Sequence, residues 1–252
     1  VVTSFSKYTG MNTSTFFPKE WGIVNYKNLL FSADSVAQFP NWFQNTFLIA
    51  CATCVISTIF VLMVAYATSC MRFKMRKTLM NVAVILNLFP GVLSMIAVYF
   101  ILKSFNLTNS HIGLILIYSA SSGLGYLIAK GFLDTVPVSL REAAYLDGAS
   151  EARVFFRVVM PMSKPIIVYT VISSFLVPWM DFVFAKMILN SGVSSQWTVA
   201  IGLYNMLEKS LINTYFTQFC AGGVIVSIPI SVLFIIMQKF YVEGVTGGAV
   251  KG

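Results

Sequence analysis

Two parts of this chain carry residues that could do chemistry, and the first is a short apolar run around Asp181. The carboxylate lies between Phe175 and Phe182, in a hydrophobic stretch where an ionisable side chain is costly and is therefore a functional candidate. Trp179 could stack on the apolar face of a ligand while Asp181 accepts hydroxyl hydrogen bonds. The alternative is structural, with Asp181 paired to Lys186 or to a neighbouring helix.

Prolines and small residues interrupt two of the apolar runs. Pro178 is expected to break or kink the helix that carries Asp181. Asn87, Pro90 and Gly91 form a similar interruption earlier in the chain. The pattern predicts two broken helices that face one cavity, so Asn87, Trp179 and Asp181 are the candidate pathway residues.

The second part is a polar, mixed-charge stretch from Thr135 to Pro165. Ser139 and Glu142 have the spacing of a capping box, which predicts a helix from Leu140 to Asp147 with Gly148 as its left-handed stop. Ser150 offers a second N-cap. A second helix is expected from Glu151 to Met160, broken by Pro161 and Pro165.

This pair of helices has an apolar side and a charged rim. The small and apolar residues that could seat in a groove of another protein are Leu140, Ala143, Ala144 and Ala149. The charged residues that could rim this face are Arg141, Glu142, Asp147 and Arg153. An amphipathic helix lying on the membrane surface is the alternative interpretation.

Other chemistry finds little support in the sequence. Cys51 and Cys54 have CxxC spacing, but no histidine or second cysteine pair accompanies them, so no metal site is predicted. His111 is the single histidine, which disfavours catalysis by a histidine base. No GxxxxGK[ST] phosphate loop occurs, so we expect no catalytic residues and no ATP bound by this chain.

The composition indicates an integral membrane protein. Of the 252 residues, 57% are hydrophobic and only 10% are charged, which is outside the range of soluble domains. Five apolar runs reach about the 20 residues needed to cross a bilayer. These runs are Trp42–Cys70, Thr78–Leu102, Ile112–Ala129, Pro165–Leu189 and Phe216–Phe240. The net charge of +8 is better explained as an orientation signal than as nucleic-acid binding.

Basic residues predict the orientation. The loop after the first run holds Arg72, Lys74, Arg76 and Lys77 and no acidic residue, which places it in the cytoplasm. Alternation then puts Thr135–Lys164 and the tail from Tyr241 inside, and Lys103–His111 and Asn190–Tyr215 outside. Residues 1–41 become an outer loop. Because the chain begins at Val1 and not at Met, we expect a sixth spanning helix before it, with a cleaved signal sequence as the weaker alternative.

The stretch around Glu142 resembles the signature loop of permease subunits of ATP-binding-cassette importers. That pattern is EAA, three residues, Gly, nine residues, and then two aliphatic positions before Pro. The matching residues are Glu142, Ala143, Ala144, Gly148, Val158, Met160 and Pro161. The resemblance covers nearly the whole chain and is strongest to the smaller permease of maltose and maltodextrin importers. It implies an all-α membrane bundle of the type I permease fold, with the permease domain at 42–252 and coupling helices at about 139–160.

The resemblance also implies partners and site residues. The expected partners are a second permease subunit, a dimer of ATPase subunits that binds ATP and Mg, and an extracytoplasmic sugar-binding protein, all within a bilayer and without nucleic acid. The residues implied to couple to the ATPase are Glu142, Ala143, Ala144, Asp147, Gly148 and Ala149. Thr246, Gly247, Gly248 and Lys251 are implied to contact the ATPase from the C-terminal tail, and Asn190, Ser191 and Gly192 to contact the binding protein.

The implied function is import of a sugar such as a maltodextrin by alternating access, driven by ATP hydrolysis in a partner subunit. Two departures from the pattern occur, Met160 in place of the usual Leu and Lys186 where an uncharged residue is more usual. The alternatives are an importer permease for another solute and a stand-alone channel or secondary transporter. No relay of charged residues across the spans supports proton coupling.

Overall fold

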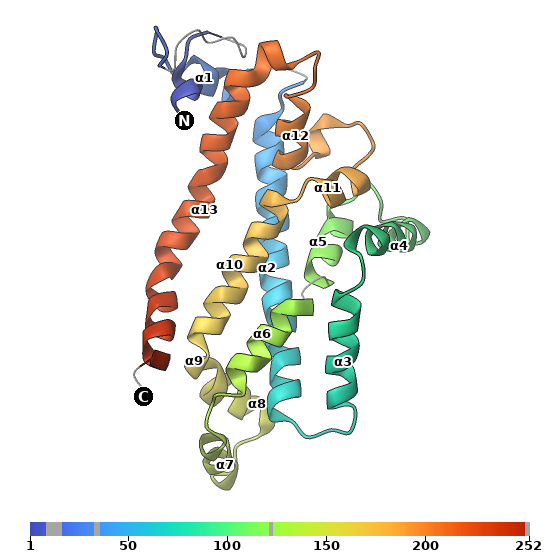
Figure 1. Ribbon diagram of the computed structural model, residues 1–252, viewed down its shortest axis with the longest axis vertical. Helices are drawn as coiled ribbons and strands as arrows, with labels where there is room; N and C mark the ends of the chain where they lie inside the picture. The colour runs from blue at the N-terminus through green and yellow to red at the C-terminus, as the bar shows by residue number, and fades with distance from the viewer. Residues whose placement is uncertain (9–16, 33–35, 121–122, 250–252) are drawn as a thin grey trace. The chain divides into compact units, whose positions relative to one another are not determined.

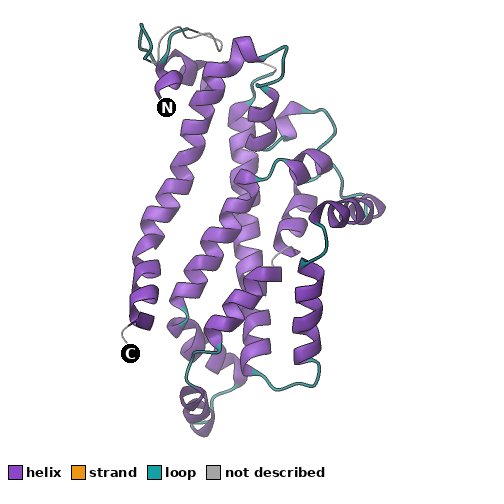
Figure 2. Ribbon diagram, in the orientation of Figure 1, coloured by secondary structure: helices purple, strands orange, loops and turns teal. Residues whose placement is uncertain are grey.

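The chain folds as an all-α protein, as the sequence predicts. The computed structural model describes residues 1–8, 17–32, 36–120 and 123–249. Within these ranges the regular elements are helices, and an isolated antiparallel bridge joins Ser6 to Trp21 (Figures 1 and 2).

The helices range in length from three residues to 38 residues. The first half of the chain forms α1 (Val24–Phe31), α2 (Phe39–Cys70), α3 (Arg76–Asn87), α4 (Gly91–Ser104), α5 (His111–Ala120) and α6 (Gly123–Leu133). The second half forms α7 (Val138–Leu146), α8 (Glu151–Val154), α9 (Met160–Met162), α10 (Lys164–Met180), α11 (Val183–Ile188), α12 (Val199–Asn205) and α13 (Ile212–Ala249). Short 3₁₀ turns lie at Val2–Phe5 and Ser194–Gln196, and a π-helical turn lies at Phe155–Val159.

Among the described residues, two unbroken helices are long and apolar enough to cross a membrane. They are α2 and the Ile212–Gln238 part of α13. With 32 residues, α2 is about 48 Å long, more than the roughly 30 Å of a bilayer core. Pro40 lies in its first turn, where the missing N–H has no helical partner anyway. Pro229 is accommodated inside α13, as membrane helices allow.

The breaks predicted in the apolar runs at residues 78–102 and 165–189 are present. Two bent helix pairs would raise the count of possible spans to four, by length and composition. The run predicted at residues 78–102 forms α3 and α4, which are separated at Leu88–Pro90. Pro90 explains this break, because a proline has no N–H to donate and clashes with the preceding turn.

The contacts divide the chain into two units. Unit 1 comprises Val1–Cys51, Tyr99–Ile115 and Leu176–Leu233. Its buried side chains include Leu29, Phe39, Trp42, Ile201 and Met206. Asn25 is fully buried there, because its amide donates to the carbonyls of Ser4 and Ser6 and its oxygen accepts from Thr217 at 2.9 Å. These bonds hold the N-terminal segment on the start of α13.

Unit 2 comprises Ala52–Val98, Leu116–Phe175 and Phe234–Gly252. Its core is built from α2, α6 and the segment that follows α7. The buried members are Val61, Leu62, Ala65, Tyr66, Ala129, Leu133, Val136, Val154, Val159 and Ile166. This core supports the polar stretch from Thr135 to Pro165.

Candidate functional site

The end of α7 is a Schellman motif with Gly148 in the left-handed region. Gly148 has φ +76°, its N–H donates to the carbonyl of Tyr145, and the N–H of Ala149 donates to that of Ala144. These two bonds satisfy carbonyls that the helix end would otherwise leave open. A Cβ on Gly148 would meet no atom within 4 Å, so backbone conformation and not space requires glycine. The predicted glycine stop is confirmed.

The predicted capping box is wrong. The helix begins at Val138 with Pro137 as its N-cap, and no side chain caps it. Ser139 therefore lies inside the first turn of α7. Pro137 is already extended, with φ −57° and ψ 127°, so the chain turns into the helix two residues before the position that the Ser139–Glu142 spacing indicates.

The second helix of this stretch also differs from its prediction. Ser150 takes the N-cap position, but without a side-chain hydrogen bond. The helix passes through Pro161 and ends at Ser163, where the Glu151–Met162 and Lys164–Met180 segments bend by 84°. A π-helical turn at Phe155–Val159 comes just before Pro161. The wider turn accommodates the proline, whose ring would otherwise crowd the carbonyl four residues earlier.

A carboxylate bound by two phenols fixes this stretch to α2. Glu151 accepts hydrogen bonds from Tyr66 at 2.6 Å and from Tyr145 at 2.7 Å. Tyr66 comes from α2 and is 5% exposed, whereas Tyr145 comes from α7. Burial and the bond to Glu151 raise the pKa of Tyr145. The sequence analysis missed Glu151 and Tyr66 as site residues, because they are 85 positions apart and nothing local links them.

Arg141 provides a second attachment, and its predicted place on the rim is corrected. Its guanidinium donates to the carbonyl of Cys70 at 3.1 Å, at the last residue of α2. The C-terminal carbonyls of a helix lack helical partners and carry partial negative charge, so a cation suits this place. Arg141 therefore binds the chain's own α2 instead of facing outward.

The outward face of α7 is apolar and holds no buried residue. Leu146 is 90% exposed, Val138 51% and Leu140 42%, and Glu142, Ala143 and Asp147 are exposed beside them. Ala144 and Ala149 instead pack on the core of unit 2. The face predicted to seat in a groove, formed by Leu140, Ala143, Ala144 and Ala149, is therefore wrong in part. Ala144 and Ala149 face inward, and the outer face also includes Val138 and Leu146.

Asp181 lies two residues before α11 and caps it. Its carboxylate accepts hydrogen bonds from the backbone N–H groups of Phe184, at 3.3 Å, and Ala185, at 3.1 Å. α10 runs through Pro178 to Met180, so the interruption comes after the proline and coincides with this cap. The half-buried Asp181 thereby has a structural task at the break of the predicted fourth span.

The remaining candidate pathway residues have local partners. Trp179 is 5% exposed and meets the ring of Phe43 edge-on, with 5.3 Å between centroids. Lys186 lies over the ring of Trp197, 5.1 Å from its centroid. Asn87 ends α3 and donates to the carbonyl of Ala83 within its own helix. Trp179 and Asp181 belong to unit 1 and Asn87 to unit 2.

The loop with Asn190, Ser191 and Gly192 is exposed and is held at its base. Trp42 donates from its indole nitrogen to the carbonyl of Ser194 at 2.8 Å. Asn45 donates to the carbonyls of Ser195 and Trp197 at 2.8 and 3.0 Å. The loop therefore presents small polar residues on a base that α2 fixes through neutral hydrogen bonds.

The C-terminal residues implied to contact an ATPase are helical as far as the structure describes them. Thr246, Gly247 and Gly248 belong to α13, which continues to Ala249. The expected tail from Tyr241 is therefore an extension of the last membrane-length helix. Lys251 lies outside the described residues.

The comparisons with known proteins agree with this architecture. Residues 62–247 match the family described as binding-protein-dependent transport system inner membrane component. The galactooligosaccharides transport system permease protein GanQ of Bacillus subtilis (strain 168) is 34% identical over 250 residues, covering 99% of this chain and 87% of GanQ. The maltodextrin transport system permease protein MdxG of the same organism is 28% identical over 256 residues, covering 100% of this chain and 90% of MdxG.

A solved structure shows the same fold. One chain of a bacterial ABC transporter involved in the import of the acidic polysaccharide alginate superposes with a TM-score of 0.78 at 20% sequence identity. The match covers 95% of this chain and 88% of that chain. This chain therefore belongs to the family of binding-protein-dependent transport system inner membrane components, and it is a multi-pass permease of the cytoplasmic membrane with the type I fold of ABC importers.

Proposed function

We propose that this chain is a permease subunit of an ATP-driven oligosaccharide importer and that α7 docks into a partner ATPase. The exposed face of α7 carries this proposal: Leu146 is 90% exposed on a helix none of whose residues is fully buried. An apolar side chain presented in this way favours a protein partner, because burial in a pocket recovers its hydrophobic free energy.

The attachments of α7 support a coupling role. Movement of a docked helix reaches the membrane segments only if the helix is firmly joined to them. The bonds of Glu151 to Tyr66 and of Arg141 to Cys70 join the α7–α8 stretch to the end of α2 in unit 2. Closing and opening of the ATPase dimer would then move α2 with α7, and alternating access would follow from that movement.

The proposed assembly has three kinds of protein partner. ATP and Mg would be bound by the two ATPase subunits, a second permease would complete the pathway, and a binding protein would deliver the sugar. Asn190, Ser191 and Gly192 would meet the binding protein, and Thr246, Gly247, Gly248 and Lys251 would reach the ATPase. Glu142 and Asp147 flank the apolar face of α7 and suit basic residues of the ATPase cleft. Asn87, Trp179 and Asp181 would shape the pathway.

The substrate class comes from the relatives. GanQ is named for galactooligosaccharides and MdxG for maltodextrin, so an oligosaccharide of neutral hexoses is the best candidate. Competing uptake of labelled maltodextrin and galactooligosaccharide into vesicles holding the whole transporter would rank the two.

A cysteine cross-link tests the docking. In a background with Cys51, Cys54, Cys70 and Cys220 replaced, Leu146→Cys should cross-link to the ATPase subunit in a nucleotide-sensitive way. Ala144→Cys is the matched control, since this alanine is two positions away but packs on the chain's own core. Equal cross-linking at both positions, or none at position 146 in an active transporter, would contradict the proposal.

A further inference from the structure

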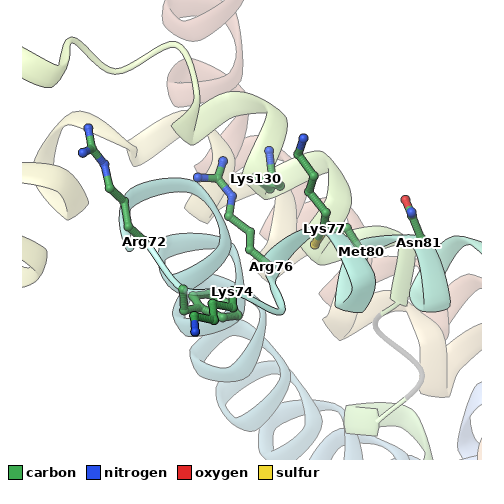
Figure 3. Close-up of a pocket in the computed structure, with 8 residues that line it drawn as sticks. Arg72, Lys74, Arg76, Lys77, Met80, Asn81 and Lys130 are labelled. Carbon is green, nitrogen blue, oxygen red and sulfur yellow. The ribbon is translucent and has the colours of Figure 1, made fainter.

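A strongly basic hollow lies where α2 ends and α3 begins. Its volume is about 870 Å³, and it is lined by Arg72, Phe73, Lys74, Arg76, Lys77, Met80, Asn81 and Lys130. Five of these eight side chains are cations, four from residues 72–77 and one from α6. Figure 3 shows the nitrogen atoms of Arg72, Arg76, Lys77 and Lys130 on the same side of the ribbon. A signal for membrane orientation requires only positive charge in a loop. It does not require cations from two separate segments of the chain to line the same hollow.

The positive charge of the hollow is poorly compensated within the chain. Asp134 accepts a hydrogen bond from Lys130 and lies 3.9 Å from Arg76. Among the residues that the structure describes, no carboxylate lies within 4.0 Å of Arg72, Lys74 or Lys77. The lining therefore has five cations and one neighbouring carboxylate, and an external anion is the natural complement.

An apolar stripe begins beside this charge. Along α3, Val84 is 44% exposed, and Leu88 at the C-cap is 78% exposed. They follow Asn81 by three and seven residues, so they continue the helix face that lines the hollow. Basic side chains at the end of a membrane-length helix, next to exposed apolar side chains, match a ligand with an anionic head and a hydrocarbon chain. A free phosphate ion would use the charge but leave the stripe unoccupied.

We propose that this hollow binds the phosphodiester headgroup of an anionic phospholipid, with an acyl chain along Val84 and Leu88. The guanidinium groups of Arg72 and Arg76 suit bidentate contacts to phosphate oxygens. The ammonium groups of Lys77 and Lys130 add point charges, and the amide of Asn81 adds a neutral donor. This site is separate from α7 and adds to the proposed function without depending on it.

Lipid retention by the whole transporter tests this site. The complex would be released from membranes of phosphatidylglycerol and phosphatidylethanolamine, and the phosphatidylglycerol retained would be counted by native mass spectrometry. Each basic residue near a membrane surface contributes about fivefold in affinity, so Arg72→Gln with Lys77→Gln should weaken retention about 30-fold. Arg157→Gln with Lys164→Gln removes the same charge from exposed positions outside the hollow and should leave retention unchanged.

A variant that is expected to bind more lipid gives a result that misfolding cannot explain. Asp134→Asn removes the carboxylate that competes for Lys130 and Arg76, and should raise retention about fivefold. Equal retention in the pocket variant and its charge-matched control would overturn the proposal. So would displacement of the lipid by inorganic phosphate, because that outcome assigns the hollow to a free anion.

Discussion

The α7 stretch and the 190–197 loop are both attached to α2, but through different kinds of hydrogen bond. Each turns at a glycine with positive φ, Gly148 at +76° and Gly192 at +74°, and each is attached to a part of α2. The α7 stretch is held by charged groups, through Glu151 and Arg141. The loop is held by neutral donors, Trp42 and Asn45, which bind its backbone carbonyls.

The difference lies in what each attachment leaves free. At α7 the polar side chains bind the chain itself, and the apolar Leu146 stays exposed for a partner. In the loop the backbone is held, and the small polar side chains of Asn190 and Ser191 stay exposed. Charge-assisted hydrogen bonds are stronger than neutral ones, so the region proposed to transmit force has the firmer attachment.

The largest expected effect comes from the exposed face of α7. Leu146→Asp should leave folding unchanged, because this side chain is 90% exposed, yet weaken ATPase binding by about 2–3 kcal/mol, or roughly 30- to 150-fold. Co-purification of the ATPase and sugar uptake would measure the loss. A variant that melts at a lower temperature and still binds the ATPase would contradict this assignment.

Removing the charged attachment comes next. Glu151→Ala leaves the buried Tyr66 hydroxyl without its partner, so we expect the unfolding free energy to fall by about 1–3 kcal/mol. Tyr145→Phe should cost less, since Tyr145 is 40% exposed. A double-mutant cycle of Tyr66→Phe with Glu151→Ala, followed by thermal melting of the purified complex, measures the coupling. Strictly additive losses would show that no such bond contributes.

The left-handed backbone conformation of Gly148 should affect the position of α7. Gly148→Ala forces an alanine to φ +76° at a cost of about 1 kcal/mol, and should displace α7 and reduce sugar-stimulated ATP hydrolysis. Gly131→Ala is the matched control, because the new methyl group also meets nothing within 4 Å and the backbone there is not left-handed. Equal activity of both variants would argue against a role for this turn.

Loss of the neutral attachment should give an effect confined to its own loop. Asn45→Ala removes the bonds to Ser195 and Trp197, at about 0.5–1.5 kcal/mol each. Protease nicking between residues 190 and 197 should become faster, and stimulation by the binding protein should fall. Nicking at the wild-type rate would mean that the bonds of Trp42 to Ser194 and of His111 to Gln196 hold the loop without Asn45.

The smallest effect concerns pH. Burial acts to raise the pKa of Asp134, but the hydrogen bond from Lys130, the bond from Ser69 and the charge of Arg76 lower it overall. Because the pKa of Asp134 is lower in the folded state, its ionised carboxylate stabilises the fold at pH values above the ordinary carboxyl pKa of about 4. This stabilisation is lost as the pH falls through the pKa of the folded state. The melting temperature of Asp134→Asn should therefore depend less on pH below about 5 than that of the wild type.

Local patterns predicted much of this fold. Hydropathy located the segments of α2 and α13, Pro90 marked the break between α3 and α4, and Gly148 marked the end of α7. Each of these signals depends on a few consecutive residues. The capping box at Ser139 was wrong because Pro137 and its neighbours set the helix start, and the break at Pro161 was wrong because a π-helical turn accommodates the proline.

The sequence by itself determined the class of protein, the helical segments and the signature stretch from Glu142 to Pro161, because hydrophobicity and glycine geometry act over short distances along the chain. Only the tertiary structure decided which residues hold that stretch and which face it exposes. Tyr66 and Glu151 are 85 positions apart, and Cys70 and Arg141 are 71 apart. Such partners are chosen by the packing of α2 against distant segments, which no local pattern encodes.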